Sequence, residues 1–279
     1  MLLRGASSNH GHALSRRLCL ITGASAGIGA AFARVYAAHG WDVAVTGRRA
    51  ERLHQLADEL RLRYGVETLV APADLSDPSA PEKLLAEVEG QGRAVDALVN
   101  NAGYSLTGGF APQAWTDHRA FLQVMLLAPT ELAHRVLPQM VERRFGRIVN
   151  VCSVAGLLPS TAGDTLYGPA KSFLIKFSQG LHLEVREHDV HVTALCPGYT
   201  WSEFHDVNGS RSRMSQAVPD WLWMGADEVA ETGYEAAEAN RPVSVPGAPY
   251  KTVAALLKAL PDDWTLQLTA RHAARLGRI

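Results

Sequence analysis

The sequence predicts a single α/β domain in which a doubly wound parallel sheet carries helices on both faces. Short apolar runs of strand length alternate with longer segments of helical periodicity, which is the pattern of parallel strands joined by crossover helices. The first apolar run ends in a glycine-rich turn that leads directly into a helical segment. The 279 residues contain no internal repeat and no low-complexity linker, so one domain is expected.

The expected strands and helices alternate along the chain. The strands are 18–22, 41–46, 68–71, 95–99, 147–152 and 190–196. The helical segments are 28–39, 50–64, 81–90, 115–142 and 170–188. The segment 115–142 is long and contains Pro129 and Pro138, where kinks or ends are expected because proline lacks the N–H group that continues a helix.

Residues 17–250 are expected to form the domain, between a flexible polar extension at 1–16 and a C-terminal helical tail at 251–279. The segment at about 200–225 has no clean periodicity and carries several aromatic side chains. Open α/β sheets bind ligands beyond the carboxyl ends of their strands, and this loop follows such an end. The loop is therefore expected to contact the substrate.

The composition argues against several classes of protein. The formal net charge is −1 and no long basic run is present, which speaks against nucleic acid as a partner. No apolar stretch approaches the roughly 18 residues needed to span a bilayer, so no membrane span is expected. The three cysteines are widely separated and form no metal-ligand pattern, so a cytoplasmic protein with reduced thiols and no metal site is expected.

The turn at 22–29 is expected to bind a diphosphate. A strand that turns through glycines into a helix exposes backbone N–H groups and the positive end of the helix dipole. Gly23 would permit the tight turn, Gly27 the close approach of phosphates, and Gly29 the packing of the helix on the strand. The expected nucleotide contacts here are Gly23, Ser25, Gly27, Ile28 and Gly29. Taken alone, the turn could equally be an ordinary glycine-rich connection without a ligand.

The end of the second strand indicates which nucleotide binds. An acidic residue at this position would hydrogen-bond a ribose 2′-hydroxyl and repel a 2′-phosphate. This chain has Arg48 and Arg49 instead, and guanidinium groups pair with phosphate oxygens in a fork. The pair favours NADP(H); the alternative is that both arginines merely begin the next helix and face water.

Tyr167 and Lys171 are four residues apart, so on a helix the phenol and the ammonium lie on one face. Hydride transfer to a carbonyl leaves charge on its oxygen, which needs a proton donor and a hydrogen-bond donor. An unperturbed phenol titrates near pH ~10, and a nearby cation lowers that pKa, so Lys171 would make Tyr167 a better acid and base. Ser153, which lies 14 residues before Tyr167, would donate to the developing oxyanion.

Together these motifs resemble the short-chain dehydrogenase/reductase family over about residues 17–246. The glycine turn, the Asn-Asn-Ala-Gly run at 100–103, Ser153, the Tyr-x-x-x-Lys pair and Pro197-Gly198 follow the order of the family. Ser153 is one residue further from the tyrosine than the family spacing, which a surface loop at 158–164 would absorb. The combination is specific although each part alone is not. It implies a Rossmann-like fold and an oxidoreductase activity.

The resemblance also assigns nucleotide contacts by position. It implies Asp74 and Leu75 at the adenine, Asn100, Asn101, Ala102 and Gly103 at the adenosine ribose and the adjoining strand, Tyr167 and Lys171 at the nicotinamide ribose, Pro197 and Gly198 beside the nicotinamide, and Thr200 near its carboxamide. The asparagines could equally be turn residues that cap a strand end. A Pro-Gly pair is also a general turn, so its weight comes from its position.

Met125 departs from the family pattern. The family commonly has an asparagine in the helix after the Asn-Asn-Ala-Gly strand, where it holds a water that links the active lysine to solvent. A thioether at this place is at best a weak hydrogen-bond acceptor. Three alternatives follow: a proton relay through backbone and water, a slow enzyme, or a protein that has lost catalysis and kept nucleotide binding.

Apolar and aromatic residues near the expected site indicate the substrate. Candidates for the substrate wall are Tyr104, Phe110, Leu157, Leu158, Tyr199, Trp201, Phe204, Trp221 and Trp223. Few charges interrupt them, apart from Asp164 and Glu203. An apolar or aromatic ketone or aldehyde is therefore expected, with alcohol oxidation as the reverse reaction. The alternative is that several of these aromatic residues belong to the core.

The expected function is NADPH-dependent reduction of a small carbonyl compound. An imine or enoyl reductase of a biosynthetic pathway would use the same residues, and a nucleotide-binding sensor or scaffold without turnover is a further alternative that Met125 supports. The family resemblance also implies a homodimer or homotetramer formed through the helical segments 115–142 and 170–188. The apolar faces of these segments could equally pack on the sheet.

Overall fold

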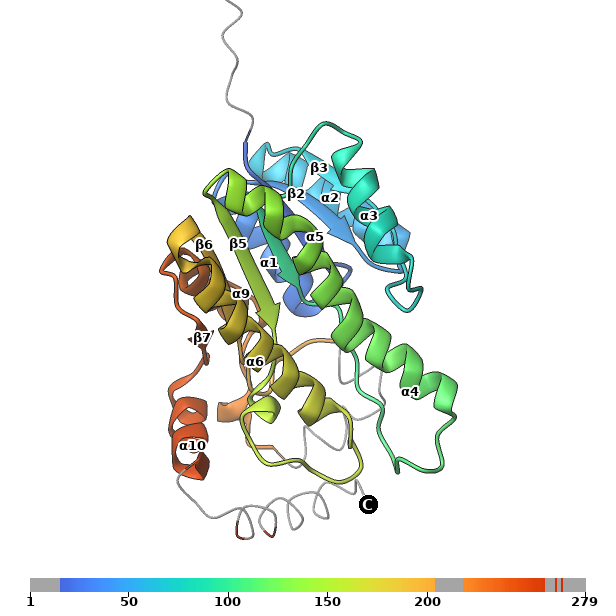
Figure 1. The fold of residues 1–279 in the computed structure, drawn as a ribbon, viewed down its shortest axis with the longest axis vertical. Helices are drawn as coiled ribbons and strands as arrows, with labels where there is room; N and C mark the ends of the chain where they lie inside the picture. Colours follow the sequence, from blue (N-terminus) through green and yellow to red (C-terminus); the bar gives the residue numbers. More distant parts are fainter. Residues whose placement is uncertain (1–15, 204–217, 259–263, 265–266, 268–279) are drawn as a thin grey trace, which may run out of the picture.

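The computed structural model describes residues 16–203, 218–258, 264 and 267. Residues 1–15 of the extension expected at 1–16, Phe204 and most of the expected tail lie outside the described residues. A parallel sheet of seven strands runs through the described part in the order β3-β2-β1-β4-β5-β6-β7 (Figure 1). Its strands are β1 (Leu18–Thr22), β2 (Asp42–Thr46), β3 (Thr68–Val70), β4 (Ala97–Asn100), β5 (Gly146–Val151), β6 (Val190–Leu195) and β7 (Val243–Ser244).

Every expected strand is present, with its ends within two residues of the expected position. β7 was not expected, because a strand of two residues is too short to show an alternating pattern. The fold class predicted from the sequence is confirmed, since one parallel sheet carries helices on both of its faces.

The direction of strand addition reverses between β1 and β4. β1 pairs with β2 on one side and with β4 on the other, so the chain first builds the sheet outward and then returns to its centre. In open α/β sheets ligands bind beyond the carboxyl ends of the strands at such a point. Thr22 and Asn100 end the two strands there.

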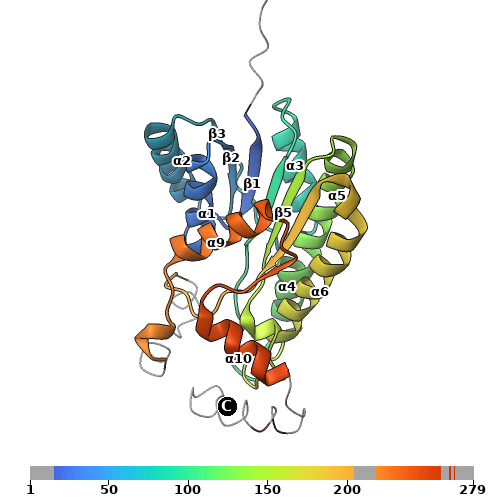
Figure 2. The ribbon, with the colours of Figure 1, turned by 90° about the vertical axis from the view of Figure 1, so that its left-hand side faces the viewer.

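Helices cover both faces of the sheet (Figure 2). On one face lie α1 (Gly27–Ala38), α2 (Ala50–Tyr64) and α9 (Ala226–Glu238), and on the other α3 (Ala80–Glu89), α5 (Ala128–Glu142) and α6 (Tyr167–Val185). α4 (Trp115–Leu122) precedes α5, and α10 (Ala248–Lys258) follows β7. α9 was not among the expected helices; it packs closely on α1, where a Cβ on Gly233 would lie 2.6 Å from Phe32 Cζ.

The helical segment expected at 115–142 is divided by a π-helix, η1 (Gln123–Leu127), between α4 and α5. Pro129 lies in the first turn of α5, in agreement with an end near this residue. An end at Pro138, one of the two alternatives expected there, is wrong, because α5 continues through this residue. Pro138 is exposed, so water can reach the backbone carbonyl that loses its N–H partner.

No helix in the described part of the chain is both long and apolar enough to cross a membrane. Within the same residues, no group of histidine, cysteine and carboxylate side chains is arranged to hold a metal ion.

Candidate active site

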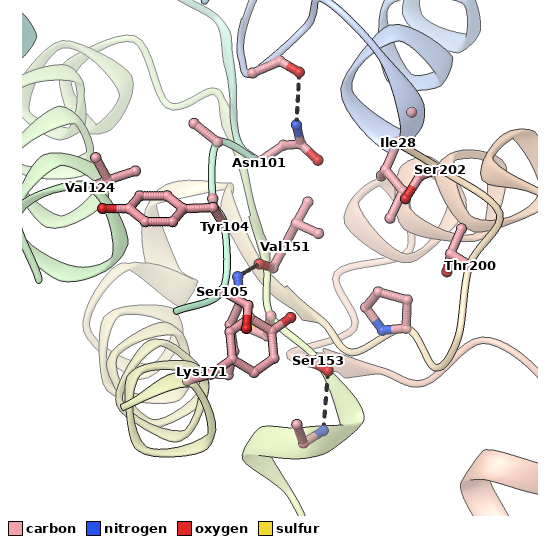
Figure 3. Close-up of a pocket in the computed structure, with 18 of the residues that line it drawn as sticks. Ile28, Asn101, Tyr104, Ser105, Val124, Val151, Ser153, Lys171, Thr200 and Ser202 are labelled. Carbon is pink, nitrogen blue, oxygen red and sulfur yellow. Dashed lines mark hydrogen bonds between the residues drawn. The ribbon is translucent and has the colours of Figure 1, made fainter. Parts of the chain in front are cut away.

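A cleft of about 1280 Å³ lies beyond the carboxyl ends of the strands (Figure 3). Its wall includes most of the nucleotide contacts expected from the sequence, namely Gly23, Ser25, Gly27, Ile28, Arg48, Arg49, Asp74, Leu75, Asn101, Ala102, Gly103, Pro197, Gly198 and Thr200. Ser153, Tyr167 and Lys171 line the same cleft. The fold therefore brings the expected nucleotide and catalytic residues to one place.

Hydrogen bonds tie the glycine-rich turn to the end of β4. Thr22 Oγ1 accepts from the backbone N–H groups of Asn101 at 2.9 Å and Ala102 at 3.0 Å. Asn101 Nδ2 donates to the carbonyl oxygens of Thr22 at 2.9 Å and Gly23 at 3.2 Å (Figure 3). A Cβ on Gly29 would lie 2.4 Å from the Gly23 oxygen, so the glycine admits the close approach of α1 to this braced turn.

The N-terminus of α1 opens onto the cleft. The residue that precedes it, Ala26, has no side chain that could accept from the first N–H groups of the helix. These groups and the helix dipole present a positive end to an anion. Gly27 has a φ of +56°, which favours glycine, and a Cβ there would lie 2.9 Å from Ser202 Cβ. The turn fits a diphosphate, and Ser202 joins the site as a neighbour that the sequence analysis missed.

The arginines that follow β2 lie at the rim of the cleft. Arg48 and Arg49 are exposed, and Arg49 donates to the Ser25 hydroxyl from Nε at 3.1 Å and from Nη2 at 2.9 Å. Asp74 Oδ1 accepts from the backbone N–H and the hydroxyl of Ser76, at 3.0 and 2.9 Å. One carboxylate oxygen of Asp74 thus closes a local turn. The guanidinium groups of Arg48 and Arg49 provide the positive charge that a 2′-phosphate needs.

The first two turns of α6 place Tyr167 and Lys171 on the cleft side. Lys171 Nζ donates to the carbonyl of Val151 on β5 at 2.7 Å and lies 5.7 Å from the centre of the Tyr167 ring (Figure 3). The lysine is 5% exposed, and its burial lowers the pKa of the ammonium group. The hydrogen bond to β5 therefore holds a buried cation beside the phenol.

Ser153 follows β5 and caps the short 3₁₀-helix η2 (Val154–Gly156). Its Oγ accepts from the Ala155 N–H at 3.1 Å, so the hydroxyl hydrogen can be donated elsewhere. Residues 157–166, between η2 and α6, form no helix or strand, so one additional residue before Tyr167 disturbs neither element.

Asn100 and Gly29 do not line the cleft. The Asn100 side chain is buried behind it, where Nδ2 donates to Asn150 Oδ1 at 2.9 Å and to the Pro129 carbonyl at 3.1 Å. The side chain braces β4 against β5 and α5. Thr200 lines the cleft, but its hydroxyl donates to the Gly198 carbonyl at 3.1 Å.

The apolar residues expected at the substrate wall divide into two groups. Tyr104, Leu158, Tyr199 and Trp221 line the cleft, whereas Phe110, Leu157, Trp201 and Trp223 do not. Trp201 stacks on Trp223 with ring centres 4.2 Å apart, and Phe110 stacks on His118 at 4.5 Å. The sequence could not separate the groups, because aromatic composition does not show which neighbour a ring meets.

Two further polar contacts belong to the cleft. Ser105 Oγ donates to Asp164 Oδ2 at 2.8 Å, and both side chains are buried. Tyr250 on α10 donates its hydroxyl to the Leu222 carbonyl at 2.5 Å and accepts from the Tyr199 N–H at 3.0 Å. Burial raises the pKa of Tyr250 to about 12. Neither Ser105 nor Tyr250 belongs to a motif, so sequence patterns offered no signal for them.

Met125 lies in the π-helix η1 and is 1% exposed. Its sulfur lies 2.9 Å from the point that a Cβ on Gly103 would occupy, and it packs against Ala170 of α6. Pro129, four residues later, lacks the N–H that would bond the Met125 carbonyl in an α-helix. An apolar side chain thus fills the position where the sequence predicts the place of the family asparagine, and the N–H of an α-helical bond to the Met125 carbonyl is absent.

Comparison with known proteins agrees with this geometry. The model of the family described as short chain dehydrogenase matches residues 17–212. Since this is more than half of the chain, the protein belongs to the short-chain dehydrogenase/reductase family, a family of oxidoreductases.

Particular relatives extend the comparison over most of the domain. Serine 3-dehydrogenase from Agrobacterium fabrum strain C58 is 37% identical over 233 residues, which cover 81% of this chain and 90% of the relative. A short-chain dehydrogenase from Sphingobium yanoikuyae, solved in complex with NADPH, is 30% identical with a TM-score of 0.76 over 88% of this chain and 96% of that one. The bulky-bulky ketone specific alcohol dehydrogenase from Comamonas testosteroni is 30% identical with a TM-score of 0.70 over 88% and 95% of the two chains.

Proposed function

We propose that this protein is an NADPH-dependent reductase of apolar or aromatic ketones and aldehydes, and that it catalyses the reverse alcohol oxidation. The observation that carries the proposal is the placement of Tyr167, buried Lys171 and Ser153 on one cleft, next to a glycine-rich turn and a pair of arginines. The relative solved with NADPH supports the choice of cofactor.

The residues present fit NADP(H). The N-terminus of α1 and the turn at 22–29 would hold the diphosphate, and Arg48 and Arg49 would hold the 2′-phosphate. Lys171 would contact the nicotinamide ribose. When bound, the nicotinamide supplies the hydride for carbonyl reduction.

Tyr167 is the proposed proton donor to the carbonyl oxygen. Lys171 lies beside the phenol and favours its ionised form, which makes proton release easier. Ser153 donates a hydrogen bond to the same oxygen, since its Oγ accepts from the Ala155 N–H and the hydroxyl hydrogen can point into the cleft. The two side chains together offset the charge that develops on that oxygen.

Proton supply to Lys171 does not require an amide side chain at position 125. The Met125 carbonyl lacks an α-helical N–H partner because Pro129 has none to give. A backbone carbonyl oxygen has two lone pairs, so it can accept from water beside a helical partner, which supports a relay through backbone and water. This arrangement favours an active enzyme over a protein that only binds nucleotide.

The charge of the cleft supports an uncharged substrate. The cations that line it among the described residues are Arg48 and Arg49 at the rim and Lys171 beside Tyr167, whereas the substrate side carries Asp164. Asp164 would repel the carboxylate of serine, the substrate in the name of one relative, although it would attract the ammonium group. The relative named for bulky ketones supports an apolar carbonyl compound instead.

The same residues would serve an imine or enoyl reductase, so substrates of these classes belong in the first test. Purified protein is mixed with NADPH or NADH and a panel of aliphatic and aromatic ketones, aldehydes, imines and enones, and nicotinamide absorbance is followed. We expect NADPH oxidation with apolar ketones or aldehydes, and a loss of at least about 100-fold in Tyr167→Phe. Turnover that persists in Tyr167→Phe would contradict the proposed mechanism.

We also propose that the protein forms a homodimer or homotetramer through α5 and α6. Phe173 and Leu183 on α6 are exposed, at 44% and 61%, which leaves apolar surface on a helix whose other side packs on the sheet. Light scattering should show a dimer or larger, and Phe173→Glu should shift it toward the monomer. A monomeric wild-type protein would contradict this proposal.

A further inference from the structure

Glu203 lines the cleft and joins Arg49, which lines it too, to Arg52 in the first turn of α2. Its Oε2 lies 2.6 Å from Arg49 Nη1, and its Oε1 lies 2.5 Å from Arg52 Nη1. Arg49 also donates to the hydroxyl of Ser25 in the glycine-rich turn. Three segments that are distant in the sequence thus meet around one carboxylate: the glycine-rich turn, the start of α2 and the segment after β6.

The backbone, and not only the ion pairs, places Glu203 there. Trp201 N–H donates to the Met224 carbonyl at 2.9 Å, and Met224 N–H donates to the Tyr199 carbonyl at 3.0 Å. Ser202 packs against Gly27, where no side chain intervenes. The segment leading to Glu203 is therefore fixed against the glycine-rich turn.

The surroundings of this carboxylate suit a phosphate equally well. The guanidinium groups of Arg49 and Arg52 hold it, and Arg49 also donates to the hydroxyl of Ser25. A phosphate monoester carries a charge of about −1.5 to −2 at pH 7 and prefers the same partners. Hydrogen bonds from Arg49 and Arg52 lower the pKa of Glu203, so the group carries its negative charge near neutral pH.

We propose that Glu203 competes with the 2′-phosphate of NADP(H) for Arg49 and Arg52, and thereby limits the preference of the protein for NADP(H) over NAD(H). The inference rests on the proposed use of NADPH, and it adds Arg52 and Glu203 as residues that determine cofactor specificity. A bound 2′-phosphate takes the arginines from Glu203, and the carboxylate opposes it by repulsion of like charges.

Removal of the Glu203 carboxylate should raise the affinity for 2′-phosphate ligands, and the increase should be modest. Side chains of Glu203, Arg49 and Arg52 are 38%, 42% and 47% exposed, so water screens both ion pairs. Removal of the carboxylate should tighten binding of ligands with a 2′-phosphate by about 3- to 10-fold. Ligands without that phosphate should bind within about 2-fold of the wild-type value.

Calorimetric titration of Glu203→Gln tests the proposal without turnover. The probes are NADP⁺ and adenosine 2′,5′-bisphosphate, compared with NAD⁺ and AMP. Glu51→Gln is the matched control, because Glu51 is an exposed carboxylate in the first turn of α2, the helix that carries Arg52, and the substitution changes net charge equally. We expect tighter binding of the two 2′-phosphate ligands by Glu203→Gln alone.

A second variant measures the coupling. In Arg52→Gln the gain from removal of Glu203 should fall to less than about 2-fold, because one of the contested cations is gone. Unchanged or weaker binding of NADP⁺ by Glu203→Gln would overturn the proposal, and weaker binding would show that Glu203 instead orients the arginines for the phosphate.

The failure of this inference is distinguishable from that of the proposed cofactor. If wild-type protein prefers NADP⁺ but Glu203→Gln gains nothing, competition is refuted and the cofactor assignment stands. If neither the wild-type protein nor Glu203→Gln prefers the 2′-phosphate ligands, both are refuted. Thermal unfolding of each variant verifies that it is folded.

Discussion

The side-chain amide of Asn101 lies where Gly29 would need room for a side chain. Asn101 Nδ2 is 2.5 Å from the position of a Cβ on Gly29, and it donates to the carbonyl oxygens of Thr22 and Gly23. The nucleotide turn is thus shaped by Asn101, the residue that follows β4, as much as by its own glycines. The relationship explains why the glycine turn and the Asn-Asn-Ala-Gly run act as one structural unit.

Gly29→Ala should damage this unit. The added Cβ would lie 2.4 Å from the Gly23 oxygen, and backbone must shift to accommodate it. We expect a loss of about 1–3 kcal/mol in the free energy of unfolding and weaker NADPH binding, measured by urea denaturation and calorimetry. Gly180→Ala is the control, because Gly180 is exposed within α6 and its Cβ would meet nothing within 4 Å. That change should stabilise the protein by about 0.5–1 kcal/mol, and equal effects of the two substitutions would contradict the steric argument.

The buried ammonium of Lys171 predicts a pH dependence. Burial lowers its pKa from the ordinary value of 10.5, so the cation is lost at a lower pH than that of an exposed lysine. Folded protein binds fewer protons than unfolded protein between the two pKa values, so this group makes stability rise with pH across that window. Over the same window kcat/KM for carbonyl reduction should fall, because Tyr167 loses its cation.

Lys171→Arg separates the effect of the positive charge at this position on activity from the effect of the side chain's shape. A guanidinium stays protonated throughout this range, so the variant should show lower activity but no alkaline loss that arises from this residue. Steady-state kinetics gives kcat/KM, and urea denaturation gives the free energy of unfolding. Both are measured from neutral pH up to the highest pH at which the protein remains folded. If kcat/KM falls with rising pH in the same way in Lys171→Arg, the fall arises from a group other than Lys171.

Met125→Asn tests how the proton relay works. We expect activity to be retained or raised, because an amide restores the residue type of the family. The same change should cost about 1–3 kcal/mol of stability, since it places a polar group in an apolar cluster at a site that is 1% exposed. Met125→Leu, which keeps the site apolar, should cost less. Loss of activity in a folded Met125→Asn variant would count against the placement of Met125 at the asparagine position.

Tyr250→Phe should weaken substrate binding and leave the proposed proton donor Tyr167 unchanged. The tyrosine hydroxyl joins the Tyr199 N–H and the Leu222 carbonyl, which flank the loop after β6. Its loss removes both hydrogen bonds, so KM for the carbonyl substrate should rise by about 3- to 10-fold with kcat nearly unchanged. The effect should be independent of pH, because the pKa of about 12 keeps the hydroxyl protonated. Tyr64→Phe, at the end of α2, is the control, and a fall in kcat alone would contradict a positioning role.

Sequence reasoning was strongest where structure follows from local periodicity. The order of strands and helices, the glycine turn and the one-turn spacing of Tyr167 and Lys171 depend on neighbours within a few residues. It failed at Pro138, where exposure to water lets a helix tolerate proline, and it missed α9 and β7. Propensity does not include solvent access, and a strand of two residues has no period to detect.

The site shows the same division. Arg48 and Arg49 were expected from their position after a strand, yet nothing local indicated that Arg49 and Glu203 meet across 154 residues of sequence. Asn100 belongs by sequence to the same run as Asn101, but alternate side chains of a strand point to opposite faces, and Asn100 points into the packing between β5 and α5.

The sequence by itself determined the α/β class and the family, and its spacing is the basis on which Ser153, Tyr167 and Lys171 are proposed as the catalytic set. Those features depend on residue spacing and composition, which can be read without knowledge of the tertiary packing. Only the tertiary structure decided that Ser202 packs on Gly27, that Met125 fills an apolar site beside Gly103, and that Glu203 lies between Arg49 and Arg52. Such contacts arise because sheet pairing and helix packing bring distant segments together, and their geometry depends on the whole fold.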